Sequence, residues 1–542
     1  MVGYVCKYSP IEIIEAFGES AARIEPARKS QAWAEKLTHP NMCSFMKCVL
    51  EEIMEENIDE VLLVNCCDSI KRLYDILKQK VNFVFLLDLP RKTDEQACRL
   101  FAKEIARLIK AYEAYKGKKF SPANLKNILV DRQKEKSKPT DGEYLGVLGA
   151  RFKEEILNEI KEKSRLNVLN FTCTGDTRLK KIIGDGQDLI LDYARSLLNS
   201  QPCMRMAERN LDFLKGVDLR GIIYNTVKFC NFYSFEYFSL KKKLNLPILK
   251  LETDYTDAGS GQLDTRIDAF LETLGAKKCD MITSQGGYFA GIDSGSTSTN
   301  VVIINEQKEI VSYAICLTGA KSLDSVYKAY DDALKKAALQ EKDIKKVVAT
   351  GYGRRGIPFA DEFVTEITCH GKGAHYLQKD IRTVVDIGGQ DSKVIRLNDT
   401  GAVVDFVMND KCSAGTGRFL EVMAKTLELT VEEMAALGSD YEEDLSITNM
   451  CTVFAESEVV SLIAQNKDKK DIIHALNKSI ATKIISLLDR LGRDGKYMMT
   501  GGVAKNSGVV REIESRLGEK VIIPFEPQIV GALGAALIAA GE

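Results

Sequence analysis

Two segments in the C-terminal half of the chain repeat one local pattern, and few folds accommodate it. Each runs from an apolar strand through a turn of the form Asp-x-Gly into a second apolar strand. The first spans residues 289–304 around Asp293, and the second spans residues 383–397 around Asp386. Because the two aspartates lie 93 residues apart in matching units, the sequence predicts two similar lobes that face each other.

The chemistry of these turns suits a phosphate. Glycine lets backbone N–H groups approach closely, Ser and Thr hydroxyls add donors, and an Asp can hold Mg²⁺ directly or through water. One such turn alone would more often be a structural hairpin. A third motif, Thr500-Gly501-Gly502, follows an apolar strand and precedes a helical pattern, as a platform for adenosine would. Together the three motifs predict a nucleotide site.

Short apolar runs alternate with helical patterns along the whole chain, which predicts an α/β protein with parallel sheets covered on both faces. A polar stretch at 131–144 separates two such lobes in the N-terminal half, and a small polar linker at 283–287 precedes the C-terminal half. The expected domains are 1–284, with lobes of about 1–130 and 165–284, and 289–542.

Composition excludes several classes of function. The formal net charge of −2 gives no reason to expect a nucleic-acid partner. The longest nearly apolar stretch, 529–540, is too short to span a bilayer, and the N-terminus lacks the pattern of a signal peptide. We therefore expect a cytoplasmic protein without membrane contact, in which the 14 cysteines are thiols rather than disulfides.

Two cysteines of the C-terminal half, Cys412 and Cys451, each open a segment that turns helical. A helix N-terminus lowers the pKa of a thiol and stabilises an anionic iron–sulfur cluster. The spacing alone would more often indicate two buried thiols near a nucleotide site. Zinc held by four thiolates across a dimer is a further alternative.

Other cysteines follow strand patterns in the N-terminal half. Cys66 and Cys67 follow the strand at 61–65, and Cys173 and Cys230 follow later ones. Ligands of open parallel sheets bind beyond the carboxyl ends of the strands. These thiols can therefore converge on one crevice.

With the segments 349–354 and 386–393, the C-terminal motifs resemble those of the activator ATPases of 2-hydroxyacyl-CoA dehydratases and the ATP-binding subunits of benzoyl-CoA reductases. The resemblance covers 289–542 and implies the two-lobed ATPase fold of acetate and sugar kinases, heat-shock-70 proteins and actin. It departs at Asn300, where the first phosphate loop of the family often ends in Lys.

The resemblance also implies ATP or ADP with Mg²⁺ as ligands of this domain. The catalytic residues it implies are Asp293, Asp386 and Gln390. The nucleotide-binding residues it implies are Gly295, Ser296, Thr297, Ser298, Gly388, Gly389, Gly501, Gly502 and Lys505.

The same family implies a homodimer in which Cys412 and Cys451 of both subunits hold one 4Fe-4S cluster. ATP binding and hydrolysis would move the helices that carry the cluster and drive one electron at low potential to an acceptor. A ferredoxin or flavodoxin would be the donor, and a separate dehydratase or reductase is a further expected partner.

The N-terminal half resembles the cluster-bearing D-component of the same dehydratases and the double-cubane-cluster proteins. The motifs include 10–18, 65–68, 171–175, 202–206 and 228–231, although the half is shorter than the family, near 131–165. The resemblance implies a second iron–sulfur or double-cubane cluster on Cys43, Cys67, Cys173, Cys203 and Cys230, with Cys48 or Cys66 as a sixth ligand. We interpret Cys6, Cys98, Cys279, Cys316 and Cys369 as structural.

The leading hypothesis from the sequence is ATP-dependent electron transfer. A small-molecule kinase of the same fold needs the nucleotide motifs but not the cysteine pair. A nucleotide or redox sensor without catalysis is the third reading.

Overall fold

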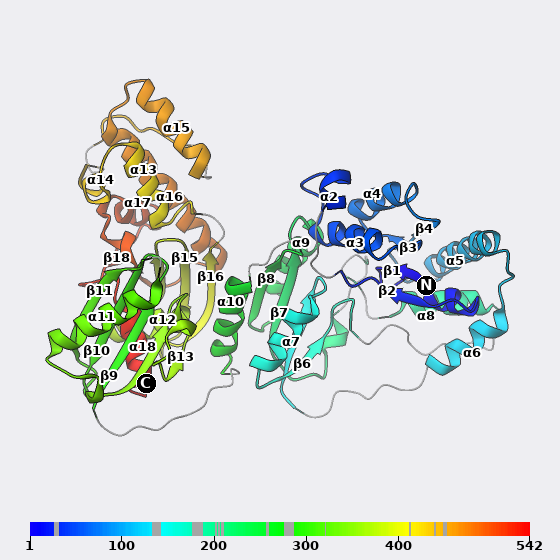
Figure 1. Cartoon of the computed structure of the whole chain (residues 1–542), viewed down its shortest axis with the longest axis horizontal. Helices are drawn as coiled ribbons and strands as arrows, with labels where there is room; N and C mark the ends of the chain where they lie inside the picture. Colours follow the sequence, from blue (N-terminus) through cyan, green and yellow to red (C-terminus); the bar gives the residue numbers. More distant parts are fainter. Residues whose placement is uncertain are drawn as a thin grey trace. The chain divides into compact units, whose positions relative to one another are not determined.

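The computed structural model describes most of the chain as two compact units, Met1–Ser260 and Gly261–Glu542 (Figure 1). The sequence-based boundary lies later, after helix α10 (Ser260–Thr273), which the structure packs into the second unit. The described residues are 1–26, 32–132, 142–175, 188–200, 203, 206, 211–255, 260–275, 287–319, 321–410, 413–437, 441–447 and 452–541.

The first unit contains two four-stranded sheets of identical design. Their orders are β2-β1-β3-β4 and β6-β5-β7-β8, and every neighbouring pair is parallel, so the predicted pair of parallel-sheet lobes is confirmed. The strands are β1 (Val2–Tyr4), β2 (Ala21–Arg23), β3 (Glu60–Asn65), β4 (Phe83–Asp88), β5 (Tyr144–Gly149), β6 (Asn167–Asn170), β7 (Leu219–Val227) and β8 (Ile248–Thr253).

Helices cover these sheets, and α5 (Glu95–Lys116) illustrates why they form. The Asp94 carboxylate accepts a hydrogen bond from the Ala97 N–H at the start, and Gly117 ends the helix in the left-handed region. Its buried residues recur every three or four positions. The other helices are α1 (Ile11–Ala16), α2 (Ala32–Leu37), α3 (Ser44–Glu55), α4 (Asp68–Leu77), α6 (Pro122–Arg132), α7 (Glu154–Lys163), α8 (Leu189–Leu198) and α9 (Asn231–Lys243).

The second unit contains two five-stranded sheets with the same strand order, β11-β10-β9-β12-β13 and β16-β15-β14-β17-β18. Asp293 on β9 pairs with Asn300 on β10, and Asp386 on β14 pairs with Lys393 on β15. The predicted repeat is therefore correct, and the unit has the two-lobed actin-like fold. Its strands are β9 (Tyr288–Ser294), β10 (Ser298–Ile304), β11 (Ile310–Leu317), β12 (Ile344–Thr350), β13 (Glu362–Phe363), β14 (Ile381–Ile387), β15 (Ser392–Leu397), β16 (Val403–Asn409), β17 (Lys496–Thr500) and β18 (Val521–Ile522).

Strand β10 shows how the first sheet acquires two buried faces. Val301 and Ile303 point to one face and pack with α11, whereas Val302 and Ile304 point to the other and pack with α18. The described helices that follow α10 in this unit are α11 (Ser322–Ala337), α12 (Glu366–Leu377), α13 (Gly417–Thr426), α14 (Val431–Leu437), α15 (Thr452–Ala464), α16 (Lys469–Leu491), α17 (Ser507–Leu517) and α18 (Val530–Ala539).

Helices α12 and α18 lie side by side between the two lobes (Figure 1). They approach so closely that a Cβ atom on Gly534 would lie 1.8 Å from the Cys369 carbonyl oxygen. Among the described helices, none is both long and apolar enough to cross a membrane.

Replacing Gly534 by Ala should force α12 and α18 apart. We expect Gly534→Ala to lower the free energy of unfolding by about 2 kcal/mol or more, since overpacking a tight contact costs ~1–3 kcal/mol. Gly356→Ala is the control, because a Cβ there meets no atom within 4 Å. Thermal unfolding of both variants measures the difference, and equal stability would contradict the close packing.

Candidate functional site

A cavity of about 590 Å³ lies in the second unit, where the turns of the two hairpins meet. The twelve residues that the resemblance assigns to catalysis and nucleotide binding all line it. They are Asp293, Gly295, Ser296, Thr297, Ser298, Asp386, Gly388, Gly389, Gln390, Gly501, Gly502 and Lys505. The volume is within the range of sites for small cofactors.

The two turns have the same geometry. The Gly295 N–H donates to the Ser298 carbonyl oxygen over 3.0 Å, and the Gly388 N–H donates to the Asp391 carbonyl oxygen over 3.0 Å. The turns also touch, since a Cβ on Gly389 would lie 1.8 Å from Oγ1 of Thr297. Glycine is therefore required where one phosphate loop approaches the other.

Lys393 is the buried cation of this site, and it was missed as a site residue by the sequence analysis. Its Nζ lies 2.9 Å from Oδ1 of Asp391, 3.1 Å from Oδ2 of Asp386 and 3.3 Å from Oε2 of Glu366. The signal was available, because Lys393 follows Asp386 by the same seven residues that separate Asn300 from Asp293. The charge that is absent at Asn300 is thus present at the equivalent position of the second lobe.

The two repeated aspartates differ electrostatically. Burial opposes ionisation of Asp386, but His370, Lys393 and the Thr500 hydroxyl outweigh it and lower its pKa to about 2. Thr500 Oγ1 donates to Asp386 Oδ1 over 2.9 Å. Burial raises the pKa of Asp293, with His370 and Lys393 opposing the shift and Asp386 and Asp391 adding to it. Asp386 is therefore the fixed anion of the pair.

Glu366 is a further buried carboxyl group in the cavity. It is the first residue of α12, and burial raises its pKa to about 8, with Lys393 opposing the shift and neighbouring acids adding to it. One turn later, His370 Nδ1 lies 3.2 Å from Thr500 Oγ1. The N-terminal part of α12 therefore supplies two titratable groups next to Asp386.

The second phosphate loop is bonded directly to the segment that follows Cys412. The Gly417 N–H donates to the Gly388 carbonyl oxygen over 2.9 Å, and the Arg418 N–H donates to that of Gly389 over 2.8 Å. Both donors lie at the start of α13, where backbone N–H groups have no acceptor within the helix itself. A displacement of the phosphate loop would therefore reach α13 through two backbone hydrogen bonds.

Cys412 and Cys451 themselves lie outside the described residues. The residues that follow them are described, and Ser413 Oγ lies 2.8 Å from Thr452 Oγ1, within hydrogen-bond distance. The fold thus brings together the two chain segments that these cysteines precede.

A second cavity, of about 280 Å³, lies in the first unit and is lined by thiols. It includes all five cysteines that the resemblance implies as ligands, and Cys66 as well. It also includes Cys6, which we interpreted as structural although it follows β1 as Cys66 follows β3. Cys48 does not line this cavity, and its thiol points to the Tyr255 carbonyl oxygen over 3.5 Å. The cysteines of the cavity are Cys6, Cys43, Cys66, Cys67, Cys173, Cys203 and Cys230.

Three of these cysteines occupy the N-cap positions of helices. Cys43 precedes α3, Cys67 precedes α4 and Cys230 precedes α9. Burial raises the pKa of the Cys43 thiol to about 12, the neighbouring Cys230 and Cys67 add to the shift, and nearby backbone N–H groups oppose it. A metal centre would displace such a proton, and the helix N-termini would stabilise the resulting thiolates.

Arg151 brings a buried positive charge to the same cavity. It is 5% exposed, and its Nε and Nη1 atoms have no hydrogen-bond partner within the described part of the chain. Its Nη2 pairs with Glu25, and the guanidinium lies 4.6 Å from the centre of the Phe45 ring. The unused donors fit an anionic group in the cavity.

The thiols of this cavity can be compared with the ligands that a metal ion or an iron–sulfur cluster requires. Among the described residues, no three His, Cys, Asp or Glu side chains converge closely enough to hold a metal ion. Thiols spread around a cavity instead match the ligand type of an iron–sulfur cluster. Of the cysteines interpreted as structural, Cys98 and Cys369 are buried, Cys316 donates to the Ser325 carbonyl oxygen, and Cys279 lies outside the described residues.

Comparisons with known proteins identify both halves. A model of the BadF/BadG/BcrA/BcrD ATPase family matches residues 290–539, and a model of the 2-hydroxyglutaryl-CoA dehydratase D-component matches 6–144 and 145–274. The 2-hydroxyisocaproyl-CoA dehydratase activator of Clostridioides difficile is 42% identical over 47% of this chain and 96% of that protein. The activator of lactoyl-CoA dehydratase of Anaerotignum propionicum is 46% identical over 46% of this chain and 97% of that protein.

A solved structure is also similar, that of component A of the (R)-2-hydroxyglutaryl-CoA dehydratase of Acidaminococcus fermentans. It is 41% identical, with a TM-score of 0.46, and the match covers 47% of this chain and 98% of that one. From the family model and the near-complete coverage of these activators, the chain belongs to the BadF/BadG/BcrA/BcrD ATPase family, and its N-terminal half is a domain of the 2-hydroxyglutaryl-CoA dehydratase D-component type.

Proposed function

We propose that this protein uses ATP to deliver single electrons at low potential to an iron–sulfur acceptor of the 2-hydroxyacyl-CoA dehydratase, benzoyl-CoA reductase or double-cubane type. The observation that carries the proposal is the pair of hydrogen bonds from α13 to Gly388 and Gly389. They join the phosphate loop to the segment that begins at Cys412. The relatives named as activators of dehydratases support the same reading.

In the nucleotide cavity, the loop N–H groups and hydroxyls would bind the phosphates of ATP. Asp293 and Asp386 would hold Mg²⁺ and, with Gln390, orient the attacking water. Lys393 keeps Asp386 ionised and fixed in place. This arrangement catalyses by positioning and electrostatics, which is what phosphoryl transfer to water needs.

Loss of the γ-phosphate removes a group from between the two loops. The Gly388–Gly389 carbonyl groups would then shift, and the first turn of α13 would follow because it is bonded to them. Ser392 Oγ also donates to the Gly415 carbonyl oxygen over 2.7 Å, so the strand β15 moves with the same segment. ATP turnover would in this way change the surroundings of Cys412.

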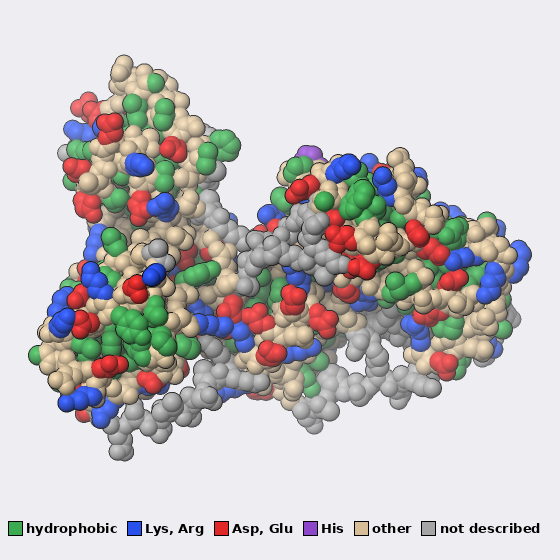
Figure 2. Space-filling view, viewed as in Figure 1, with side chains coloured by type: hydrophobic (Ala, Val, Ile, Leu, Met, Phe, Trp, Pro, Cys, Tyr) green, Lys and Arg blue, Asp and Glu red, His purple; other side chains and the backbone are tan. Residues whose placement is uncertain are grey.

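An iron–sulfur cluster on Cys412 and Cys451 would supply the one-electron chemistry at low potential. Two thiolates per chain complete a four-thiolate site only in a homodimer. An exposed apolar face on α15 supports this assembly, because Val453, Phe454 and Val460 are 53–67% exposed directly after Cys451. Hydrophobic side chains are visible at the surface over this part of the unit (Figure 2). A homodimer would bury that face.

The thiol-lined cavity of the first unit would hold the accepting cluster. Three helix N-caps and the unused donors of Arg151 would stabilise its negative charge. A ferredoxin or flavodoxin would be the electron donor, and a separate dehydratase or reductase would be a further acceptor. The reducing cytoplasm is the compartment that would keep so many thiols available for iron.

The ATPase cluster can be tested by exchanging both Cys412 and Cys451 for Ser. We expect the iron in anaerobically reconstituted protein to fall by about two atoms per chain, the share of one four-iron cluster in a dimer. ATP hydrolysis should persist, because the phosphates would be held by the loops at Gly295 and Gly388 rather than by thiols. Cys316→Ser is the control. A colourless wild-type protein without iron or acid-labile sulfide would refute the proposal.

The role of Asp386 predicts a loss of turnover rather than of binding. Asp386→Asn keeps the side-chain shape but removes the charge, so kcat for ATP hydrolysis should fall ~100-fold or more while KM changes little. Asp399→Asn is the matched control, since its carboxylate is exposed on a turn of the same lobe. Steady-state kinetics measures both variants, and unchanged turnover in Asp386→Asn would exclude this role.

The thiol-lined cavity predicts different outcomes for two cysteines of the same half. Cys6→Ser should lower the iron and sulfide content of the first unit's cluster, because Cys6 lines the cavity. Cys48→Ser should leave the content unchanged, because Cys48 lies outside that lining. Iron and sulfide per chain after anaerobic reconstitution distinguish them. The reverse result would show that the cavity is not the cluster site.

A further inference from the structure

Helix α10 belongs to different halves of the protein by sequence and by structure. The D-component model extends to residue 274, and the ATPase family model begins at residue 290. The compact ATPase unit nevertheless begins at Gly261 and includes α10. The ATPase of this chain therefore contains a helix that lies outside its own family model.

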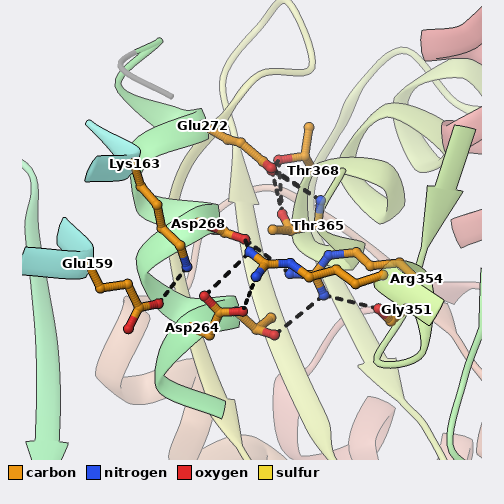
Figure 3. A network of polar contacts seen from close by, with 11 residues as sticks. Glu159, Lys163, Asp264, Asp268, Glu272, Gly351, Arg354, Thr365 and Thr368 are labelled. Atoms are coloured by element: carbon orange, nitrogen blue, oxygen red, sulfur yellow. Dashed lines mark hydrogen bonds and ion pairs between the residues drawn. The ribbon is translucent and has the colours of Figure 1, made fainter. Parts of the chain in front are cut away.

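One set of contacts joins α10 to the first phosphate hairpin. Asp268 is 1% exposed, and its Oδ2 accepts from Nη2 of Arg354, 3% exposed, over 3.2 Å (Figure 3). Arg354 Nη1 donates to the Gly351 carbonyl oxygen over 3.0 Å. Two residues on, the Gly353 N–H donates to the carbonyl oxygen of Ser294, the last residue of β9, over 2.9 Å. The buried ion pair is thus joined, through the turn at residues 351–353, to the end of β9, where the first phosphate turn begins.

A second set joins α10 to the start of α12. Oε2 of Glu272 accepts from the hydroxyl groups of Thr365 over 2.5 Å and Thr368 over 2.7 Å, as Figure 3 shows. The Thr365 N–H also donates to Glu272. A carboxylate at a helix N-terminus satisfies free N–H groups and the helix dipole. Glu272 therefore fixes the turn of α12 that presents Glu366 to Lys393.

A third set reaches the second lobe. Arg266 binds the Asp410 carboxylate with both Nη2, at 2.7 Å, and Nε, at 3.2 Å. Gln262 Nε2 donates to the Asp410 carbonyl oxygen over 2.8 Å. Asp410 follows β16, whose neighbour β15 starts at the second phosphate turn. α10 is thus anchored on both lobes.

Helical geometry explains how α10 can contact both lobes. Gln262 and Arg266 are one turn apart, as are Asp268 and Glu272. Asp268 lies two positions after Arg266, which is a rotation of roughly 200°. The two pairs therefore face in nearly opposite directions. Gln262 also lines the nucleotide cavity.

We propose that α10 is an interlobe strap that couples the nucleotide state of the ATPase to the chain segment at Asp410. An opening of the cleft must move Arg354 relative to Asp410, and the strap resists that motion because it binds both. The inference rests on nucleotide binding and requires no iron–sulfur cluster.

The test measures two quantities in the full-length protein without cluster. One is the dissociation rate of a fluorescent ADP analogue with Mg²⁺, and the other is hydrogen–deuterium exchange of residues 403–410 with and without ADP. Asp268→Asn should speed dissociation ~10-fold, because it removes the charge that pairs with both Arg354 and Arg355. In Arg266→Gln, the nucleotide-dependent change in exchange at 403–410 should disappear. Asp331→Asn, in an exposed pair on α11, is the matched control.

A double-mutant cycle separates coupling from simple loss of packing. If the strap connects the lobes, Arg266→Gln should add little to the dissociation rate once Asp268→Asn is present. Multiplicative effects, or an unchanged nucleotide response at 403–410 in Arg266→Gln, would overturn the proposal. Arg266→Lys gives the same test with the charge retained, in case Arg266→Gln does not fold, because Lys cannot form the bidentate pair.

Discussion

The structure of the ATPase unit depends on one buried ammonium group. Lys393 is 2% exposed and faces three carboxylates, of which Asp386 and Asp391 lie within 3.1 Å. Isolated buried charges are very costly, so the cation and the acids must stay together for the lobe to remain folded. The same pairing holds Asp386 ionised in the nucleotide cavity. Stability and catalysis therefore both require that Lys393 and Asp386 stay paired in the second phosphate hairpin.

From that hairpin, rigidity extends in two directions through backbone contacts. Gly388 and Gly389 accept hydrogen bonds from the start of α13, and Gly389 contacts Thr297 of the first hairpin. Because these contacts involve main-chain atoms and leave no room for side chains, small displacements are transmitted rather than absorbed. The nucleotide loops and the start of α13 thus behave as one connected element, which is the physical condition for a change of nucleotide to move α13.

The sequence predicted the repeat, the parallel sheets and a nucleotide site at the hairpins, because strand periodicity and Asp-x-Gly turns are local signals. Lys393 was missed because a lysine in a strand usually faces solvent, although its spacing from Asp386 matches that of Asn300 from Asp293. Its register opposite Asp386 places it beside the buried carboxylate. Cys6 was not placed at the cavity by the sequence because its strand, β1, has only three residues. The position of α10 could not be read from sequence, since it depends on ion pairs such as Arg266–Asp410 between residues 144 positions apart.

The location of α10 shows that the fusion of the two halves is more than a linker between separately folded domains. A linker between separately folded domains would raise only their effective concentration. Here the last helix matched to the D-component is held by Arg354 and Asp410 and belongs to the compact ATPase unit. Any motion that separates those two partners must strain α10 or break an ion pair. A helix that the D-component model includes is therefore part of the structure that joins the two lobes of the ATPase.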